Sequence, residues 1–332
     1  MVTAVWKKIL SDASIQRSSQ TLSVVGSNAF VYGGELKPRE PVDSAVHSIS
    51  LNSDPSSNAL ATINVTNSPQ PRVGAASTAL NEKIYIFSGR GGIAMAPIEE
   101  NGALWVFDTT NKSWSSLTPA DPSAAYPAGR SYHAITSNRK DTLFVHAGCP
   151  ESSRLSDLWA FNISTRQWTE LPSAPGPQRG GPSITYSNGK LYRMNGFDGK
   201  TEQGGALDVF DLASNTWNTI TYTADGVNGP TPRSVSCLLP VDISGRSSLV
   251  TMFGEHDPSS LGHQGAGKML SDAWAFDVEL EKWTKIAFSG EAPQPRGWFD
   301  ADIHEGQAAI VVHGGLAEWN ERLGDVWVLQ FQ

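Results

Sequence analysis

Cysteine is scarce in this sequence. Its 332 residues include two cysteines, Cys149 and Cys237, and neither stands in a paired metal-finger spacing. Two isolated thiols favour a reducing compartment over a disulfide framework. The sequence also lacks an apolar run of membrane-spanning length, and residues 1–10 have no signal-peptide pattern. We therefore expect a soluble, cytoplasmic protein with no membrane partner.

Dense clusters of basic residues are missing as well. The formal net charge is −8 and the isoelectric point is about 5.4. An acidic chain without a run of lysine and arginine lacks the electrostatic footprint of a nucleic-acid-binding protein. We expect no nucleic-acid partner.

What the sequence does have is internal repetition. An arginine preceded by polar or proline-rich sequence recurs at intervals of 49–63 residues, and each is followed by an apolar run that ends at glycine. In the unit 127–171, four short runs of β-branched and aromatic residues alternate with turn residues, which predicts four antiparallel strands. Repeats of this length indicate a solenoid or a propeller. The repeated arginines are Arg17, Arg72, Arg130, Arg179, Arg233 and Arg296.

The last repeat is incomplete. It ends at residues 326–329 with no fourth strand, whereas residues 6–10 carry the Trp-x-x-x-Leu pattern of a closing strand. A ring of blades hides its sheet edges when the N-terminal strand completes the last blade. We therefore predict an all-β, six-bladed β-propeller over residues 1–332. Its blades begin near residues 17, 72, 130, 179, 233 and 296, and residues 6–10 pair beside residues 327–331.

The strand order predicts one functional end of the ring. Because adjacent strands run in opposite directions, the six arginines and the loops that follow the glycine stops lie at the same end. These loops are long and polar, whereas the turns between the first and second strands are short. Such asymmetry in loop length points to a functional face.

The six arginines have two interpretations. Arginines that open a repeat often donate hydrogen bonds to nearby carbonyl groups. Alternatively, they line a cationic mouth for a small anion or an acidic peptide. The substrate-binding residues predicted for this mouth are Glu35, Arg90, Arg130, Arg179, Arg233, Arg296 and Trp298.

The longest of the polar loops spans residues 254–268. Its Glu255, Asp257 and His263 place two carboxylates and an imidazole within nine residues. Two carboxylates with one histidine suit Fe(II) with open coordination positions. The alternative is a loop organised by hydrogen bonds around its glycines, with Asp257 and Pro258 in a turn.

The glycine stops and closing tryptophans resemble kelch repeats along the whole chain. Several motifs are similar to the plant glucosinolate specifier proteins, which include epithiospecifier, nitrile-specifier and thiocyanate-forming proteins. The resemblance implies a kelch propeller that uses Fe(II) and acts on the labile aglycone released by myrosinase. The motifs are Tyr32-Gly33-Gly34-Glu35, Arg130-Ser131-Tyr132-His133, Pro295-Arg296-Gly297-Trp298 and Asn320-Glu321-Arg322.

The same resemblance implies roles for single residues. Glu255 and His263 match the outer positions of the family's Glu-x-x-x-Asp-x-x-x-His iron triad, but the middle position is Ser259 and Asp257 lies two residues earlier. Arg90 matches the arginine that holds an anionic group, which makes Arg90, Glu255 and His263 the implied catalytic residues. Trp298 matches a tryptophan that forms an apolar wall, and packing between blades is its alternative.

Three functions stay open at this point. The first is a specifier-like lyase or isomerase that acts, with Fe(II), on a labile anionic small molecule. The second is a metal-free cyclase or isomerase of specialised metabolism that uses the same pocket. The third is a non-catalytic kelch module that binds an acidic peptide. The sequence makes no prediction about the oligomeric state.

Overall fold

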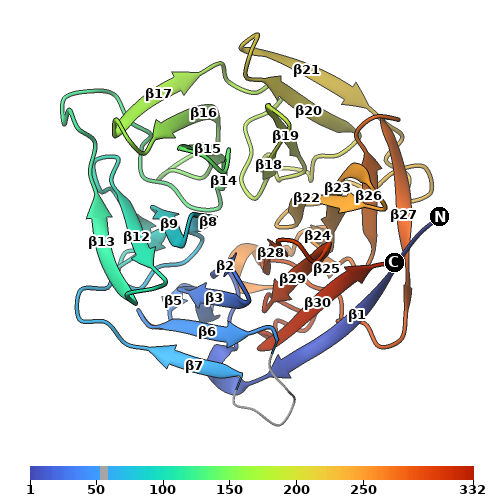
Figure 1. The fold of residues 1–332 in the computed structure, drawn as a ribbon, viewed down its shortest axis with the longest axis horizontal. Coiled ribbons are helices and arrows are strands. Elements are labelled where there is room, and N and C mark those ends of the chain that lie inside the picture. The colour runs from blue at the N-terminus through green and yellow to red at the C-terminus, as the bar shows by residue number, and fades with distance from the viewer. Residues whose placement is uncertain (53–58) are drawn as a thin grey trace.

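The computed structural model describes residues 1–52 and 59–332, with only the backbone of His263. Apart from two single-turn 3-10 helices, η1 (Ala13–Ile15) and η2 (Gly262–Gln264), the regular elements in this described part are strands. Figure 1 shows them as six blades around a central axis, which the chain circles once. The predicted six-bladed propeller is confirmed. No helix within the described ranges is long and apolar enough to cross a bilayer.

Each blade is a four-stranded antiparallel sheet, and its strands follow one another from the axis outward (Figure 1). Blade 1 comprises β2 (Thr21–Val25), β3 (Asn28–Tyr32), β6 (Val46–Ser50) and β7 (Leu60–Ile63). Blade 2 comprises β8 (Ala76–Leu80), β9 (Lys83–Phe87), β12 (Leu104–Asp108) and β13 (Ser113–Leu117). Blade 3 comprises β14 (Ala134–Ser137), β15 (Thr142–Gly148), β16 (Leu155–Asn162) and β17 (Gln167–Leu171).

The second half of the ring repeats this plan. Blade 4 comprises β18 (Ser183–Ser187), β19 (Lys190–Met194), β20 (Ala206–Asp211) and β21 (Thr216–Thr221). Blade 5 comprises β22 (Cys237–Ile243), β23 (Arg246–Met252), β26 (Ala273–Asp277) and β27 (Lys282–Ser289). Blade 6 comprises β28 (Asp300–His304), β29 (Ala309–His313), β30 (Asp325–Phe331) and β1 (Val2–Ser11). Short ribbons follow three of the second strands: β4 (Glu35–Lys37) with β5 (Glu40–Pro41), β10 (Arg90–Gly91) with β11 (Ala96–Pro97), and β24 (Glu255–His256) with β25 (Lys268–Met269).

The N-terminal strand closes the ring. Strand β1 pairs antiparallel with β30, so that Trp6 lies opposite Leu329, as the sequence predicted. Its first residues also pair parallel with β27, where Val2 lies opposite Ile286. Strand β1 therefore joins blades 5 and 6 into one eight-stranded sheet (Figure 1), which leaves no open edge at the point of closure.

The closing tryptophans pack against the strand next to them. In blade 3, the ring centroids of Phe161 and Trp168 lie 4.8 Å apart, and the Trp168 indole donates to the carbonyl of Gly102 in blade 2 at 2.8 Å. The same aromatic pair recurs in three other blades at 5.0–5.1 Å. Each pair buries a large apolar surface, so these tryptophans hold the blades together.

Candidate functional site

The structure brings the repeat arginines and the loops after the glycine stops to the same end of the disc. In every blade, the residue after the arginine forms an isolated antiparallel bridge with the residue after the glycine stop. This end of the propeller is called the mouth below. The bridged mouth residues that follow the glycine stops are Glu35, Arg90, Cys149, Phe197, Glu255 and Leu316.

A closed ring of backbone hydrogen bonds surrounds the axis just inside the mouth. Each of six residues donates its N–H to the carbonyl of its counterpart in the neighbouring blade, at 2.7–3.2 Å, and the sixth bond returns to the first residue. This set is called the axial ring. Its members are Ser19, Gly74, Tyr132, Gly181, Val235 and Trp298.

The axial ring is strained at four of its positions. All six residues have φ between 47° and 63°, a left-handed conformation that costs a non-glycine residue about 1–2 kcal/mol. For a β-branched residue such as Val235 it is a genuine outlier. Tyr132, Val235 and Trp298 nevertheless keep large side chains there. Backbone strain of this kind is concentrated at binding sites.

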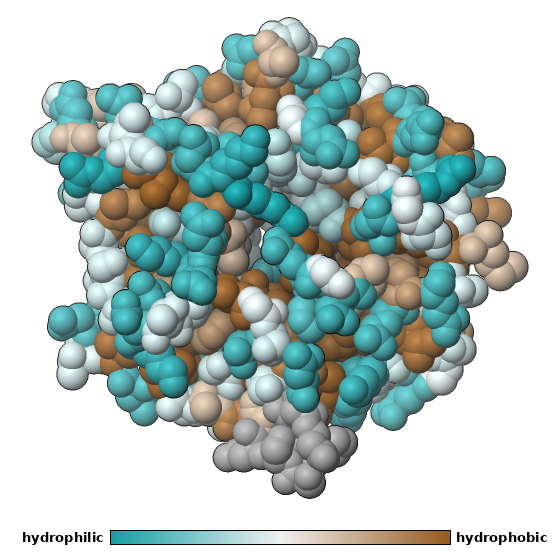
Figure 2. Space-filling model, in the orientation of Figure 1, coloured by the Kyte–Doolittle hydropathy of each residue, from teal (hydrophilic) through white to brown (hydrophobic). Residues whose placement is uncertain are grey.

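A narrow cavity of about 210 Å³ runs along the axis below the ring. It is lined by the inner strands and includes Tyr132, Trp298 and Asp300. At its far end, Arg139 of blade 3 and Glu305 of blade 6 form an ion pair at 2.9 Å. Because these blades face each other across the ring, the pair bridges that opening. Figure 2 shows one face of the disc, with hydrophilic side chains around a narrow central opening.

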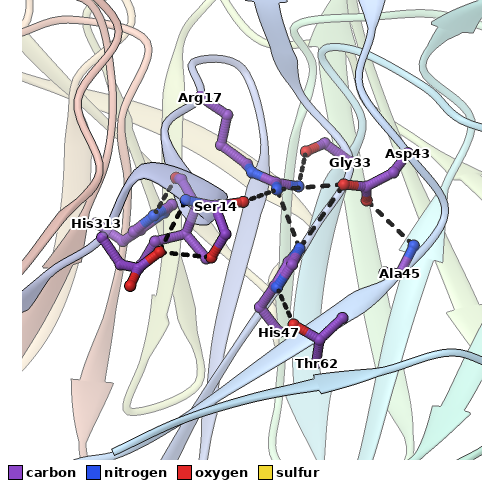
Figure 3. Close-up of polar contacts among 10 residues, drawn as sticks. Ser14, Arg17, Gly33, Asp43, Ala45, His47, Thr62 and His313 are labelled. Atoms are coloured by element: carbon purple, nitrogen blue, oxygen red, sulfur yellow. Dashed lines mark hydrogen bonds and ion pairs between the residues drawn. The ribbon is translucent and has the colours of Figure 1, made fainter.

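The six repeat arginines point into their own blades. Their guanidinium groups are almost fully buried, and Arg130, for example, donates to the carbonyls of Ala128 and Ala147 and to both oxygens of Asp157. Figure 3 shows the blade 1 version, in which Arg17 contacts Gly33, Asp43 and His47. The hydrogen-bonding interpretation of these arginines is thus the one that the structure shows.

This placement favours the hydrogen-bonding interpretation over the cationic mouth, because the guanidinium groups are buried within the blades. Arg72, Arg233 and Arg296 are paired with Glu100, Asp272 and Asp325, respectively. Substrate contact by Arg130, Arg179, Arg233 and Arg296 stays a prediction.

Glu35 lies in the mouth but is already engaged. It is 8% exposed, its Oε1 accepts from Arg322 at 3.1 Å, and its Oε2 accepts from the backbone N–H of Arg39 at 2.7 Å. Burial raises the pKa of Glu35. Its contact with Arg322 ties the blade 6 loop to the blade 1 loop, so Glu35 supports the wall of the mouth.

Arg90 is the half-buried guanidinium at the mouth of blade 2. It donates to the hydroxyl of Ser131 at 2.7 Å, and to the carbonyls of Met95 and Pro150 at 3.1 and 2.7 Å. A guanidinium has five N–H groups, so these three bonds fix its position and leave two donors for a ligand.

Glu255 lies opposite Arg90, because blades 2 and 5 face each other across the ring. It is 5% exposed, and its Oε1 accepts from the N–H of Gly267 at 2.8 Å. Burial raises the pKa of Glu255 to about 7, and the nearby Glu202 carboxylate acts in the same direction. Burial also raises the pKa of Glu202, whose Oε1 is enclosed without a hydrogen-bond partner among the residues that the structure describes.

The described side chains do not assemble the expected iron triad. The Asp257 carboxylate is 60% exposed and lies 3.4 Å from both Lys268 Nζ and His256 Nε2, so it is directed to the surface. No three His, Cys, Asp or Glu side chains among those described are grouped to hold a metal ion. The side chain of His263 lies outside the described set, so the prediction that it is a ligand stays open.

Comparison with known proteins identifies the repeat family. Residues 19–254 match the KLHDC2/KLHL20/DRC7 Kelch-repeats domain. The chain belongs to this kelch family. The kelch propeller is also similar to a solved structure, YjhT, with a TM-score of 0.74 and 15% identity over 98% of this chain and 99% of that chain. This likeness supports the fold alone.

The kelch propeller aligns with different shares of its curated relatives. It is 27% identical to N-(sulfonatooxy)prop-2-enimidothioate sulfolyase of Thlaspi arvense, over 94% of this chain and 91% of that protein. It is 24% identical to acyl-CoA-binding domain-containing protein 4 of Arabidopsis thaliana, over 74% of this chain and 35% of that protein. The first match confirms the resemblance to specifier proteins.

Two mouth residues of the kelch propeller were given no role by the sequence analysis. Tyr132 was quoted within a motif without a role, yet it lies in the axial ring beside the cavity. Glu202 was overlooked because it comes five residues after the bridged Phe197, although an isolated bridge joins the two. Tyr132 could have been found from its position, two residues after a repeat arginine. In each blade the residue at this position belongs to the axial ring.

Proposed function

We propose that this kelch propeller is a specifier-like lyase that acts on a labile, anionic small molecule at the mouth. The proposal rests mainly on the placement of Arg90 and Glu255, which lie in opposite blades at the same end of the axis. The alignment with a sulfolyase over nearly the whole chain supports this reaction class.

The residues at the mouth suit the loss of sulfate. When a bond between nitrogen and a sulfate oxygen breaks, its electron pair leaves with the sulfate, and a bonding pair of the neighbouring carbon moves to the nitrogen in its place. The two remaining donors of Arg90 stabilise the departing oxyanion through charge-assisted hydrogen bonds. Glu255 supplies a buried carboxyl group for proton transfer. Tyr132 and Trp298 provide the walls of the axial opening.

The test uses a glucosinolate cleaved by myrosinase in the presence of the protein, with gas chromatography of the products. The wild type should shift the product distribution away from that of the aglycone alone. Arg90→Ala should reduce the shift at least about tenfold, whereas Arg139→Ala at the far end of the cavity should leave it unchanged. An unaltered distribution with the wild type would remove this function.

Iron binding is a separate prediction. Glu255 and His263 would be the ligands, with Asp257 joining only if its loop rearranges, and a bound Fe(II) would supply a Lewis acid at the mouth. Metal analysis after Fe(II) titration should give one ion per chain in the wild type and none in His263→Ala. Equal metal content in both proteins would exclude these ligands.

A second function, a protein-interaction module, is favoured by exposed apolar residues on the mouth loops. Leu36, Ile93, Leu261 and Trp319 are 47%, 108%, 69% and 92% exposed. The loops of Leu261 and Trp319 are connected, since Asn320 donates to the carbonyl of Gln264 at 3.2 Å. Large apolar residues around a mouth are typical of an interaction site. A peptide that binds the wild type but not Trp319→Ala, while Arg90→Ala leaves its affinity unchanged, would support this module.

A further inference from the structure

In one blade, the repeat arginine forms no ion pair with a carboxylate of the described residues. In blades 1, 2, 3, 5 and 6, the repeat arginine meets a carboxylate of its own blade. In blade 4, no carboxylate among the described residues forms an ion pair with Arg179. Arg179 is nevertheless only 6% exposed.

The strand registers show why the carboxylate is missing. Phe161 pairs with Trp168 in blade 3, and Phe210 pairs with Trp217 in blade 4, which aligns the two sheets. Counting back from these phenylalanines, Ala206 occupies the position of Asp157. The only nearby carboxylate on the strand is Asp208, which occupies the position of Trp159 and bonds instead to Arg193 and Thr219.

Arg179 still holds the orientation of the paired arginines. Its Nε donates to the carbonyl of Pro177 at 3.2 Å, and its Nη1 donates to the carbonyl of Asn195 at 3.0 Å. Arg130 makes the same two bonds, to Ala128 and Ala147, at 2.8 and 3.1 Å. The Nη2 group of Arg179 therefore points to the place that a carboxylate oxygen fills in the other blades.

The local charge is unbalanced. Arg193 is fully buried, its Nη2 has no hydrogen-bond partner among the described residues, and its Nη1 pairs with the carboxylate of Asp208. Burial, and then the charge of Arg193, lower the pKa of Arg179 to about 9. Two buried guanidinium groups with one buried carboxylate, Asp208, leave an excess positive charge that the more exposed Asp198 offsets only in part, and a buried charge without a partner is costly.

The place of the missing carboxylate lies close to the surface. In the five paired blades, the side chain of the partner carboxylate is 13–40% exposed. Ala206 is half-buried, and the adjoining Gly176 of the loop before Arg179 is exposed. A small anion therefore has a route to Arg179 without unfolding of the blade.

We propose that blade 4 contains an anion-binding site in which a small carboxylate-sized oxyanion, such as formate, acetate or bicarbonate, binds Arg179 at the place of the missing aspartate. This site is separate from the mouth and goes beyond the proposed lyase function. A planar anion of this size accepts from Nη2 as the aspartate does in the other blades. The bound anion balances the charge of Arg179 and Arg193 and stabilises the native state.

The experiment measures formate binding to the whole chain by isothermal titration calorimetry at constant ionic strength. The wild type should bind one formate per chain. Ala206→Asp should lose at least about tenfold in affinity, because the new carboxylate takes the place of the anion. Arg139→Gln, which removes an exposed arginine, should bind as the wild type does.

A second variant tests the site independently, in case Ala206→Asp does not fold. Arg179→Gln, checked for native circular dichroism, should also lose formate binding at least about tenfold. The site is refuted if the wild type shows no saturable binding of formate or acetate. It is equally refuted if a folded Arg179→Gln or Ala206→Asp protein retains wild-type affinity.

Discussion

The ion pair in blade 3 offers a direct test of what the repeat arginines do. Asp157→Ala removes the carboxylate that accepts from Arg130 at 2.7 and 2.9 Å and from the Trp159 indole at 2.9 Å. Arg130 is 1% exposed, so its charge would stay buried without a counter-ion. The variant reproduces in blade 3 the arrangement that blade 4 has naturally at Arg179.

The size of the effect follows from burial. Removing one partner of a buried pair costs about 3–5 kcal/mol. The Asp157 side chain is 17% exposed, so water replaces part of the lost interaction and the lower end, about 3 kcal/mol, is expected. At roughly 2 °C per kcal/mol for a large domain, the melting temperature should fall by about 6 °C.

Urea denaturation monitored by tryptophan fluorescence measures the change. The control is Arg246→Ala, which breaks a surface pair with Asp277 in which the arginine side chain is 55% exposed, and should destabilise the protein much less than Asp157→Ala does. Adding Arg130→Met to Asp157→Ala should recover part of the loss, because it removes the unpaired charge. If Asp157→Ala costs no more than the control, the arginines do not hold the blades together.

Three further outcomes follow from the fold. Burial raises the pKa of Asp300 to about 7 and of Asp302 to about 6, so the native state binds protons that the unfolded chain releases above about pH 4. These aspartates therefore make a stabilising contribution that is lost as pH rises from about 4 to 7, whereas buried histidines such as His133 and His313, whose pKa is lowered by burial, act in the opposite direction. The free energy of unfolding of the wild type relative to Asp302→Asn should fall over this range in urea titrations, and a difference that does not change with pH would contradict it. Deleting residues 1–11 exposes β30 and separates blades 5 and 6, so the thermal transition should lose cooperativity in circular dichroism; a native melt would contradict the closure. Gly254→Ala, whose new Cβ would lie 2.7 Å from the carbonyl of Ser234 at φ +102°, should cost more than about 1 kcal/mol in the same denaturation assay, and Gly245→Ala is the matched control because it has positive φ but meets no neighbouring atom.

The arrangement of the mouth was partly predictable. The alternation of strands determines that Arg90 and Glu255 emerge at the same end, and the bridges in all six blades confirm it. The direction of a side chain does not follow from strand order. The repeat arginines turn into the blades because carbonyl and carboxylate acceptors from later strands surround them there.

The sequence by itself determined the strands, the number of blades and the closing role of the N-terminal strand, because these depend on periodic patterns that each repeat carries locally. Only the tertiary structure decided the rest. The parallel pairing of β1 with β27, the axial ring and the unpaired Arg179 all depend on contacts between segments remote in the chain. Such contacts are set by the geometry of the closed disc, and no single repeat encodes it.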